Sequence, residues 1–343
     1  MTSGTYLLGY NPTPRNRKIF CIIATVMWIL LSGLRGASVG ADTEAYKIGF
    51  EQLDRKSWDE LFRNFSDIFF QGADGKDPGY NILAKVIYTI CPNYQFFLIF
   101  IACLFHIPLG IIIYKESSAP LLSWMIYSSL FYSFFAITGH RQTIATALVV
   151  LIGYQFIKKR KLICFLLLVA IASTIHASSI IFLPFYFISR VKIGRIGLIL
   201  FLGTFPITYV YRNQLMSLVA GFIGYEEYTE YATSGPVMFL IVFLMIMLVI
   251  IVGAKSILGD KNSNVSSWMT AICIAFVFIP LAFVNPSAMR GVQYYSIFLI
   301  LLMPETLRMF NRQDKKIVYL VCVSVLLFAL VRNNPTYLFF WQK

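Results

Sequence analysis

The sequence predicts an all-α protein, a polytopic bundle of transmembrane helices. Of its 343 residues, 58% are hydrophobic and only 13% are charged, whereas a soluble domain carries roughly 25% charged residues. The apolar residues gather in blocks such as Phe96–Tyr114 and Met238–Val252, and most of these blocks approach the roughly 20 residues needed to cross the hydrocarbon core. Because lipid cannot satisfy backbone N–H and C=O groups, each block is expected to be a helix.

The first apolar block, Ile19–Leu34, follows three basic residues, Arg15, Arg17 and Lys18. No small-x-small cleavage pattern ends this block, so we expect a retained first span rather than a signal peptide. The basic residues before it place the N-terminus on the cytoplasmic side. The polar segment 35–79 then forms the longest loop and lies outside.

The outer loop is expected to contain an amphipathic helix at about residues 57–70. Ser57 followed by Glu60 is a capping-box pattern. Apolar residues then recur at helical spacing, namely Trp58, Leu61, Phe62, Phe65, Ile68 and Phe69. Such a helix lies on the membrane surface or packs on the bundle of spans. Residues 81–91 are apolar but too short to span, which favours a re-entrant or interfacial helix.

Ten further spans give about 11 in a single membrane domain of residues 1–343. They are expected at residues 95–114, 119–137, 140–157, 162–175, 177–190, 195–211, 236–254, 266–284, 291–304 and 316–332. The inner loops hold 14 of the 29 basic residues but only four of the 16 acids, and the other twelve acids fall outside. This asymmetry orients the protein and places the C-terminus outside.

The net charge of +13 does not indicate nucleic-acid binding, because most basic clusters lie in short loops between spans. The chain shows no cytosolic domain and no glycine-rich phosphate loop, and its six cysteines lack metal-ligand spacing. We therefore expect no nucleic-acid partner, no cofactor and no metal, although the acidic pair Glu226 and Glu227 leaves a metal open.

Three polar segments fall at the outer ends of spans, where a polar residue usually has a partner or a function. The first runs from Arg35 to Tyr46, with Asp42 and Thr43 at a helix N-cap position. It suits close approach to a ligand, and a capped turn with a snorkelling arginine is the alternative.

The second segment is Gly139-His140-Arg141-Gln142 and the third contains His176. The rigid donor fork of an arginine suits a phosphate or carboxylate, unless it only anchors a helix end to lipid headgroups. A neutral histidine can act as a general base, although a lone histidine is more often hydrogen-bonded between helices.

Two further outer segments carry weaker signals. One ends at Arg290, and the other contains Glu226 and Glu227 among tyrosines, a mixture that suits either sugar binding or an interfacial aromatic belt. Five residues share the outer side under a topology assigned from other charges: Arg35, Asp42, Arg141, His176 and Arg290. Three arginines and a histidine near one outer cavity fit a doubly charged anion and a base.

Short motifs also follow one another in a fixed order. They are Arg35…Val39-Gly40-x-Asp42-Thr43-x-x-Tyr46, Pro78-Gly79-Tyr80, Arg141-Gln142-x-x-Ala145 and His176-x-Ser178. Over roughly residues 15–310 this series resembles the EpsG-like branch of the Wzy-type polysaccharide polymerases. The resemblance implies a glycosyltransferase of the bacterial cytoplasmic membrane, with a fold similar to the membrane-embedded GT-C class.

The function implied by the resemblance is polymerisation of oligosaccharide repeat units, carried on undecaprenyl diphosphate, into exopolysaccharide, capsule or O-antigen. The implied partners are the lipid-linked oligosaccharide, membrane lipid, and flippase and chain-length regulator proteins. A sugar hydroxyl of the acceptor would attack the anomeric carbon of the donor, displace undecaprenyl diphosphate and invert the anomeric centre. The reaction would take place at the outer face and use no nucleotide sugar.

This mechanism assigns roles to individual residues. Arg141 and Arg290, with Arg35 as a third candidate, are expected to bind the diphosphate. His176 is the first choice for the base that takes the hydroxyl proton, and Asp42 is the second. The residues expected to contact the rest of the substrate are Gln142, Tyr46, Tyr80, Glu226 and Glu227.

Three other functions remain open. An O-antigen ligase would need the same arginines, but ligases tend to carry their large outer loop late in the chain, whereas here it is early. A transporter of lipid-linked oligosaccharides would favour internal repeats and broken helices near the midplane. A structural subunit of an assembly complex predicts that Arg141 and His176 can be replaced with effects on stability alone.

Overall fold

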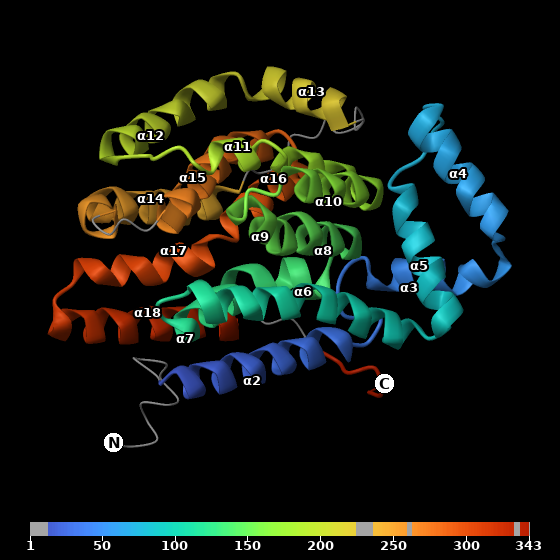
Figure 1. The fold of residues 1–343 in the computed structure, drawn as a ribbon, viewed down its shortest axis with the longest axis horizontal. Helices are drawn as coiled ribbons and strands as arrows, with labels where there is room; N and C mark the ends of the chain where they lie inside the picture. Colours follow the sequence, from blue (N-terminus) through green and yellow to red (C-terminus); the bar gives the residue numbers. More distant parts are fainter. Residues whose placement is uncertain (1–12, 224–235, 259–262, 333–336, 343) are drawn as a thin grey trace. The chain divides into compact units, whose positions relative to one another are not determined.

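The computed structural model describes residues 13–223, 236–258, 263–332 and 337–342 (Figure 1). Within these ranges every regular element is a helix, and the one β-contact is an isolated bridge between Arg35 and Phe339. The expected all-α class is therefore confirmed. The chain divides into two compact units, residues 1–180 with 324–343 and residues 181–323.

In the first unit, α2 (Pro14–Gly33) packs along α6 (Tyr94–Glu116), and these two helices match the first two expected spans (Figure 1). Thr13 caps α2 by accepting a hydrogen bond from the N–H of Asn16 at 3.3 Å. Pro14 takes the first helical position, where its missing N–H would have no helical partner anyway. Helix α2 is therefore defined by local sequence signals as well as by apolar length.

The next two expected spans are also helical, and both contain π-helical turns. Residues 120–137 comprise α7 (Pro120–Ile126), η2 (Tyr127–Phe131) and η3 (Ser133–Ile137). Residues 140–158 comprise α8 (His140–Thr146), η4 (Ala147–Ile152) and α9 (Gly153–Lys158). Gly139 separates them with φ 67° and ψ 55°, a left-handed conformation that glycine adopts at little steric cost. π-Helical turns occur often at functional sites.

The segment between α2 and α6 forms four short helices: α3 (Thr43–Glu51), η1 (Gln52–Arg55), α4 (Trp58–Phe70) and α5 (Pro78–Ile90). A helix is present where the amphipathic helix was expected, as α4, and its position at the membrane surface stays a prediction. Ser57 accepts a hydrogen bond from the N–H of Glu60 at 3.1 Å, as the capping pattern predicts. Leu61 is buried, whereas Phe62 and Phe69 on the same helix are at least half exposed.

Residues 337–342 return to the loop that follows α2. The N–H of Gly36 donates to Leu338 O at 2.8 Å, and the N–H of Phe340 donates to Leu34 O at 3.0 Å. The hydroxyl of Tyr337 donates to Leu31 O. We call residues 337–342 the closing segment. Because it pairs with residues just after α2, the chain must cross the membrane an even number of times between them, and the ten spans expected there satisfy this condition.

The first unit is completed by α10 (Leu162–Ile175), the start of η5 (Ala177–Phe182) and the end of α18 (Arg312–Arg332). The second unit contains the remaining elements. They are α11 (Phe185–Ile188), α12 (Arg195–Val210), α13 (Arg212–Ile223), α14 (Val237–Leu258), α15 (Ser263–Phe278), η7 (Ile279–Phe283), η8 (Pro286–Ala288), α16 (Met289–Ser296), α17 (Leu299–Thr306) and η9 (Leu307–Met309).

Two expected spans differ from the structure. The span at 177–190 is no continuous α-helix, because a 3-10 helix over Ala177–Phe182 is followed by a single α-helical turn. The span at 291–304 is split into α16 and α17 by two residues in turn conformation. Helix α13 was not expected at all. Pro184 lies at the break in the first of these segments, and proline removes a helical hydrogen bond.

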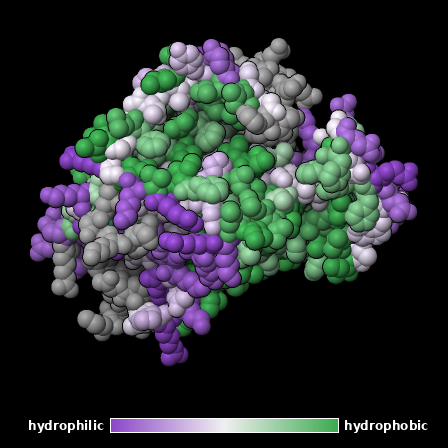
Figure 2. Space-filling model, turned by 45° about the horizontal axis from the view of Figure 1, so that its top comes forward, coloured by the Kyte–Doolittle hydropathy of each residue, from purple (hydrophilic) through white to green (hydrophobic). Residues whose placement is uncertain are grey.

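Among the described residues, four helices are long and apolar enough to cross a membrane: Pro14–Gly33, Tyr94–Glu116, Phe239–Ile257 and Asn264–Phe283. Four shorter apolar helices accompany them, at Pro120–Phe131, Leu162–Ile175, Ala177–Ile188 and Arg195–Val210. Apolar residues cover much of the exposed surface in Figure 2, and hydrophilic residues gather in separate patches. Side chains such as Ile163 and Ile196 are about three-quarters exposed, as expected of a lipid-facing surface. The total of about 11 spans stays a prediction.

Candidate functional site

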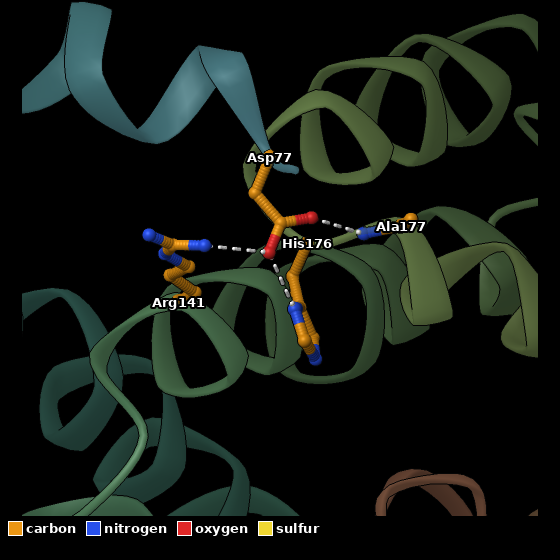
Figure 3. Close-up of polar contacts among 4 residues, drawn as sticks. All are labelled: Asp77, Arg141, His176 and Ala177. Carbon is orange, nitrogen blue, oxygen red and sulfur yellow. Dashed lines mark hydrogen bonds and ion pairs between the residues drawn. The ribbon is translucent and has the colours of Figure 1, made fainter. Parts of the chain in front are cut away.

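The candidate site lies in the first unit and centres on Asp77. Its Oδ2 atom accepts hydrogen bonds from Nδ1 of His176 and from Nη1 of Arg141, each at 3.2 Å (Figure 3). Its Oδ1 atom accepts the N–H of Ala177 at 3.0 Å. The start of α5, the start of α8 and the end of α10 therefore meet at one carboxylate.

Asp77 is buried with only 3% of its side chain exposed, so its charge depends on these donors. Burial by itself would raise the pKa of the carboxyl group. The hydrogen bond and charge of His176, the N–H of Ala177 and the charge of Arg141 outweigh burial, and the pKa lies below its ordinary value. The group is therefore a carboxylate at neutral pH.

The local sequence explains how Asp77 reaches this position. Asp77 has φ 56° and ψ 52°, a left-handed conformation that Asp tolerates better than most residues, and Pro78 then starts α5. Gly79 lies against the end of α10: an added Cβ would stand 2.7 Å from the Cβ of Thr174 and 2.9 Å from its carbonyl carbon. Only glycine lets α5 approach α10 this closely, which brings Asp77 within reach of His176.

His176 ends α10 in an extended conformation, with its N–H bonded to Ala172 O at 2.8 Å. Its side chain is 5% exposed. Because a carboxylate only accepts hydrogen bonds, Nδ1 must carry the proton that faces Asp77. In the neutral ring Nε2 then holds the lone pair, which makes it the nitrogen that can accept a proton.

Arg141 lies in the first turn of α8, directly after the turn at Gly139. Its guanidinium carbon lies 5.2 Å from the ring centre of Tyr80 and 5.9 Å from that of Tyr46, distances typical of cation–π contacts. About 30% of the side chain is exposed, and its Nε is buried without an acceptor among the described residues. With one of five N–H groups on Asp77, the guanidinium still has donors for an anion.

A second buried cluster lies behind these tyrosines. Nη1 of Arg35 donates to Ser32 O at 2.5 Å, and its Nη2 lies 2.8 Å from Nε2 of His140. Because arginine only donates, Nε2 of His140 must accept, and the neutral ring carries its proton on Nδ1, 3.5 Å from the hydroxyl of Tyr80. The ring of Tyr46 stacks on His140 at 4.3 Å. Burial lowers the pKa of Arg35, yet an arginine remains protonated.

A model of the EpsG family matches residues 18–341. The chain belongs to the EpsG family. The expected resemblance is thus confirmed, and the match extends past residue 310 to include α18 and the closing segment. Comparison with curated proteins and with solved structures gave no match. Membership of the EpsG family indicates a membrane protein with a polymerase-like role in polysaccharide biosynthesis.

In this EpsG family protein, the structure brings several predicted site residues together. His176 and Arg141 meet at Asp77, and Tyr46 and Tyr80 pack beside Arg141. Gln142 follows Arg141 in α8 and is partly buried. Their roles toward a substrate stay predictions.

The remaining predicted residues lie apart from this group or outside the described residues. Asp42 is the N-cap residue of α3, as expected, but it is exposed and its side chain makes no capping hydrogen bond. Arg35 is 3% exposed and donates to the protein itself. Arg290 lies in the second unit, in the first turn of α16. Glu226 and Glu227 fall outside the described residues.

Sequence reasoning missed two members of the site, Asp77 and His140. Asp77 directly precedes the motif Pro78-Gly79-Tyr80, and an acid before a proline that starts a helix is a visible signal. His140 adjoins Arg141 and was noted without a role. Its partner Arg35 lies 105 residues away, so no local pattern links the two.

Proposed function

We propose that this EpsG family protein polymerises lipid-linked oligosaccharide repeat units at the outer face of the cytoplasmic membrane. The glycosyl donor and the glycosyl acceptor are both oligosaccharides carried on undecaprenyl diphosphate. The observation that carries the proposal is the arrangement of His176 and Arg141 around Asp77, which puts a base and an anion-binding cation at one place. The polymerase-like role of the family supports the choice of reaction.

His176 is the base in this proposal. A hydroxyl of the acceptor sugar gives its proton to Nε2, and the hydroxyl oxygen forms a bond to the anomeric carbon of the donor. Asp77 holds the ring in the required tautomer through Nδ1 and stabilises the imidazolium that forms. The attack comes from the face opposite the leaving group, so the anomeric centre is inverted.

Arg141 binds the leaving group. As the bond between the anomeric carbon and the diphosphate oxygen breaks, the electron pair stays with that oxygen and negative charge grows there. A fixed guanidinium in a site with little water stabilises this charge in the transition state. Tyr46 and Tyr80 limit the positions of the guanidinium because they lie within 6 Å of it.

The proposal is tested in the natural host, by deleting the gene and complementing the deletion. The complementing chains are the wild type, His176→Ala and Arg141→Ala, with membrane levels compared by immunoblotting. Arg212→Ala is the matched control, because the contacts described for Arg212 are local: it donates to Tyr209 O at 2.8 Å, and its guanidinium lies over the Tyr209 ring. The surface glycan and the lipid-linked intermediates are both analysed.

We expect the deletion strain to hold single repeat units on the lipid carrier and to lack long chains. The wild type and the Arg212→Ala control should restore long chains, whereas His176→Ala and Arg141→Ala should not. Long lipid-linked chains that fail to reach their final acceptor would instead support a ligase. Full-length polymer from both site variants at normal protein levels would refute the site assignment.

A further inference from the structure

Arg141 and His176 donate to the same oxygen atom. Nη1 of Arg141 and Nδ1 of His176 each lie 3.2 Å from Oδ2 of Asp77, whereas Oδ1 accepts a backbone N–H (Figure 3). An oxygen that already accepts a hydrogen bond from a cation is a weaker acceptor for a second donor. The residue proposed to bind the anion and the residue proposed to act as base are thus linked through one atom.

We propose that Asp77 couples anion binding at Arg141 to the basicity of His176. The proposal rests on the proposed function, which assigns the anion and the base. A diphosphate held by Arg141 offsets the charge of the guanidinium and competes with Asp77 for its N–H groups. Oδ2 is then left with a stronger hydrogen bond to Nδ1 of His176, and a proton on Nε2 is better stabilised.

The functional consequence is an ordered activation of the site. Without a bound glycosyl donor, the positive charge of Arg141 offsets part of the stabilisation that Asp77 gives to a protonated His176, because a nearby cation disfavours the imidazolium. Once Arg141 binds the diphosphate of the glycosyl donor, His176 becomes a stronger base. This happens when the anomeric carbon of the donor is in place for attack by the acceptor hydroxyl. Such coupling is reciprocal, so protonation of His176 must tighten anion binding by the same factor.

The elements packed around His176 supply few other charges among the described residues. Helices α10 and η5 contain no charged residue, and η4 contains none. Helix α8 supplies His140 and Arg141. Helix α5 supplies Lys85, which donates to the backbone carbonyl of Leu53 at 2.6 Å, and the exposed Lys76 precedes Asp77. Asp77 is thus a charged group in direct contact with the ring, and Arg141 reaches the ring through the same carboxylate oxygen, where an anion would act.

The test measures the protonation of His176 directly. The full chain is placed in lipid nanodiscs with ¹⁵N-labelled histidine rings. Its three histidines give few signals, and His176→Gln identifies the one that belongs to His176. Ring ¹⁵N shifts are followed against pH, first alone and then with saturating inorganic pyrophosphate. Binding of pyrophosphate is measured separately by calorimetry.

We expect pyrophosphate to raise the pKa of His176 by about one unit, which is a tenfold change in proton affinity and within the usual range of coupling between sites. In Asp77→Asn pyrophosphate should still bind, but the shift should fall below half. Glu116→Gln is the matched control, because it neutralises a carboxylate that pairs with Lys158 rather than with the site. It should keep the full shift.

Each of the other outcomes refutes a specific part of the proposal. Bound pyrophosphate with an unchanged pKa of His176 refutes the coupling and leaves the proposed function standing. No binding of pyrophosphate refutes the coupling together with the role of Arg141. If pyrophosphate shifts the pKa of His176 in Asp77→Asn as much as in the wild type, Asp77 does not mediate the coupling. Should Asp77→Asn fail to fold, the wild type decides alone: pyrophosphate must bind about tenfold more tightly below the pKa of His176 than above it.

Discussion

Nδ1 of His176 lies 3.2 Å from Oδ2 of Asp77, although 99 residues separate the two in the chain. The contact fixes which ring nitrogen is protonated, and thereby which one can act as a base. It also connects the end of α10 with the start of α5. The first prediction tests this contact by replacing Asp77 with asparagine, a side chain of nearly the same shape but without the charge.

Asp77→Asn should reduce the rate of polymerisation by on the order of 10²–10⁴, the usual contribution of a general base. The amide can turn its NH₂ group toward Nδ1, which moves the ring proton to Nε2 and blocks proton transfer from the acceptor. The rate is measured with purified protein and lipid-linked repeat units, over a range of pH. A rate within threefold of the wild type, at equal protein, would contradict this role of Asp77.

Acid should remove the stabilising effect of Asp77. Because its pKa lies below the ordinary value of 3.8, the carboxylate stabilises the fold above that value, and this contribution disappears as the pH falls through the folded-state pKa. The thermal midpoints of the wild type and Asp77→Asn should therefore converge below about pH 4 and stay apart from pH 5 to 7. A difference in midpoint that is independent of pH would contradict the low pKa.

Gly79→Ala should disrupt the site by pushing α5 away from α10. The added Cβ would lie 2.7 Å from the Cβ of Thr174 and 2.9 Å from its backbone, so the backbone has to move, at a cost of about 1–3 kcal/mol. Polymer formation should fall at least tenfold. Gly203→Ala is the control, because Gly203 also lies within a helix but has nothing within 4 Å of its added Cβ. Equal behaviour of the two variants would count against close packing at Gly79.

Arg35→Lys should lower stability, because Nη1 and Nη2 of Arg35 reach two different acceptors, Ser32 O and Nε2 of His140. One ammonium group cannot replace both contacts, and a buried acceptor left without a donor costs about 1–3 kcal/mol. The unfolding midpoint should drop, whereas Arg212→Lys, at a partly exposed site with local contacts, should leave it unchanged. A weaker affinity for the lipid-linked donor at unchanged stability would instead favour Arg35 as a diphosphate ligand.

The closing segment should lie on the same side of the membrane as Asp42. The test introduces Gln342→Cys or Asp42→Cys, one at a time, into a chain whose six native cysteines have been replaced. A membrane-impermeant maleimide added to intact cells should label both positions, since residues 338 and 340 pair with the loop after α2 and this loop is predicted to be outside. Labelling of one position but not the other would contradict the pairing.

Sequence patterns predicted the elements whose signals are local. Helix α4 follows from the capping pattern at Ser57 and from apolar residues at helical spacing. The break at Gly139 follows from a glycine between two apolar blocks. Composition could not distinguish a continuous span from the 3-10 helix and turn at 177–188, because both bury the same apolar side chains, and only Pro184 marked the break.

The site was predicted in part for a related reason. His176 and Arg141 stood out because each is a polar residue beside an apolar block. Asp77, which joins them, lies in a loop with many other acids. It becomes part of the site only through contacts with Arg141 and His176, which lie 64 and 99 residues away in the chain. The burial of Arg35 likewise depends on a contact with His140 of another helix. The spacing of hydrophobic residues along the sequence does not reveal such a contact.

The closing segment also limits when the loop after α2 can be completed during synthesis. The loop that holds Arg35 is formed early in translation, but its backbone partners at residues 338 and 340 leave the ribosome only after all the helices have been made. A nascent or prematurely terminated chain that stops before them therefore lacks these backbone hydrogen bonds. Pairing of this loop with the closing segment has to follow synthesis of α18 and is thus a late step in assembly.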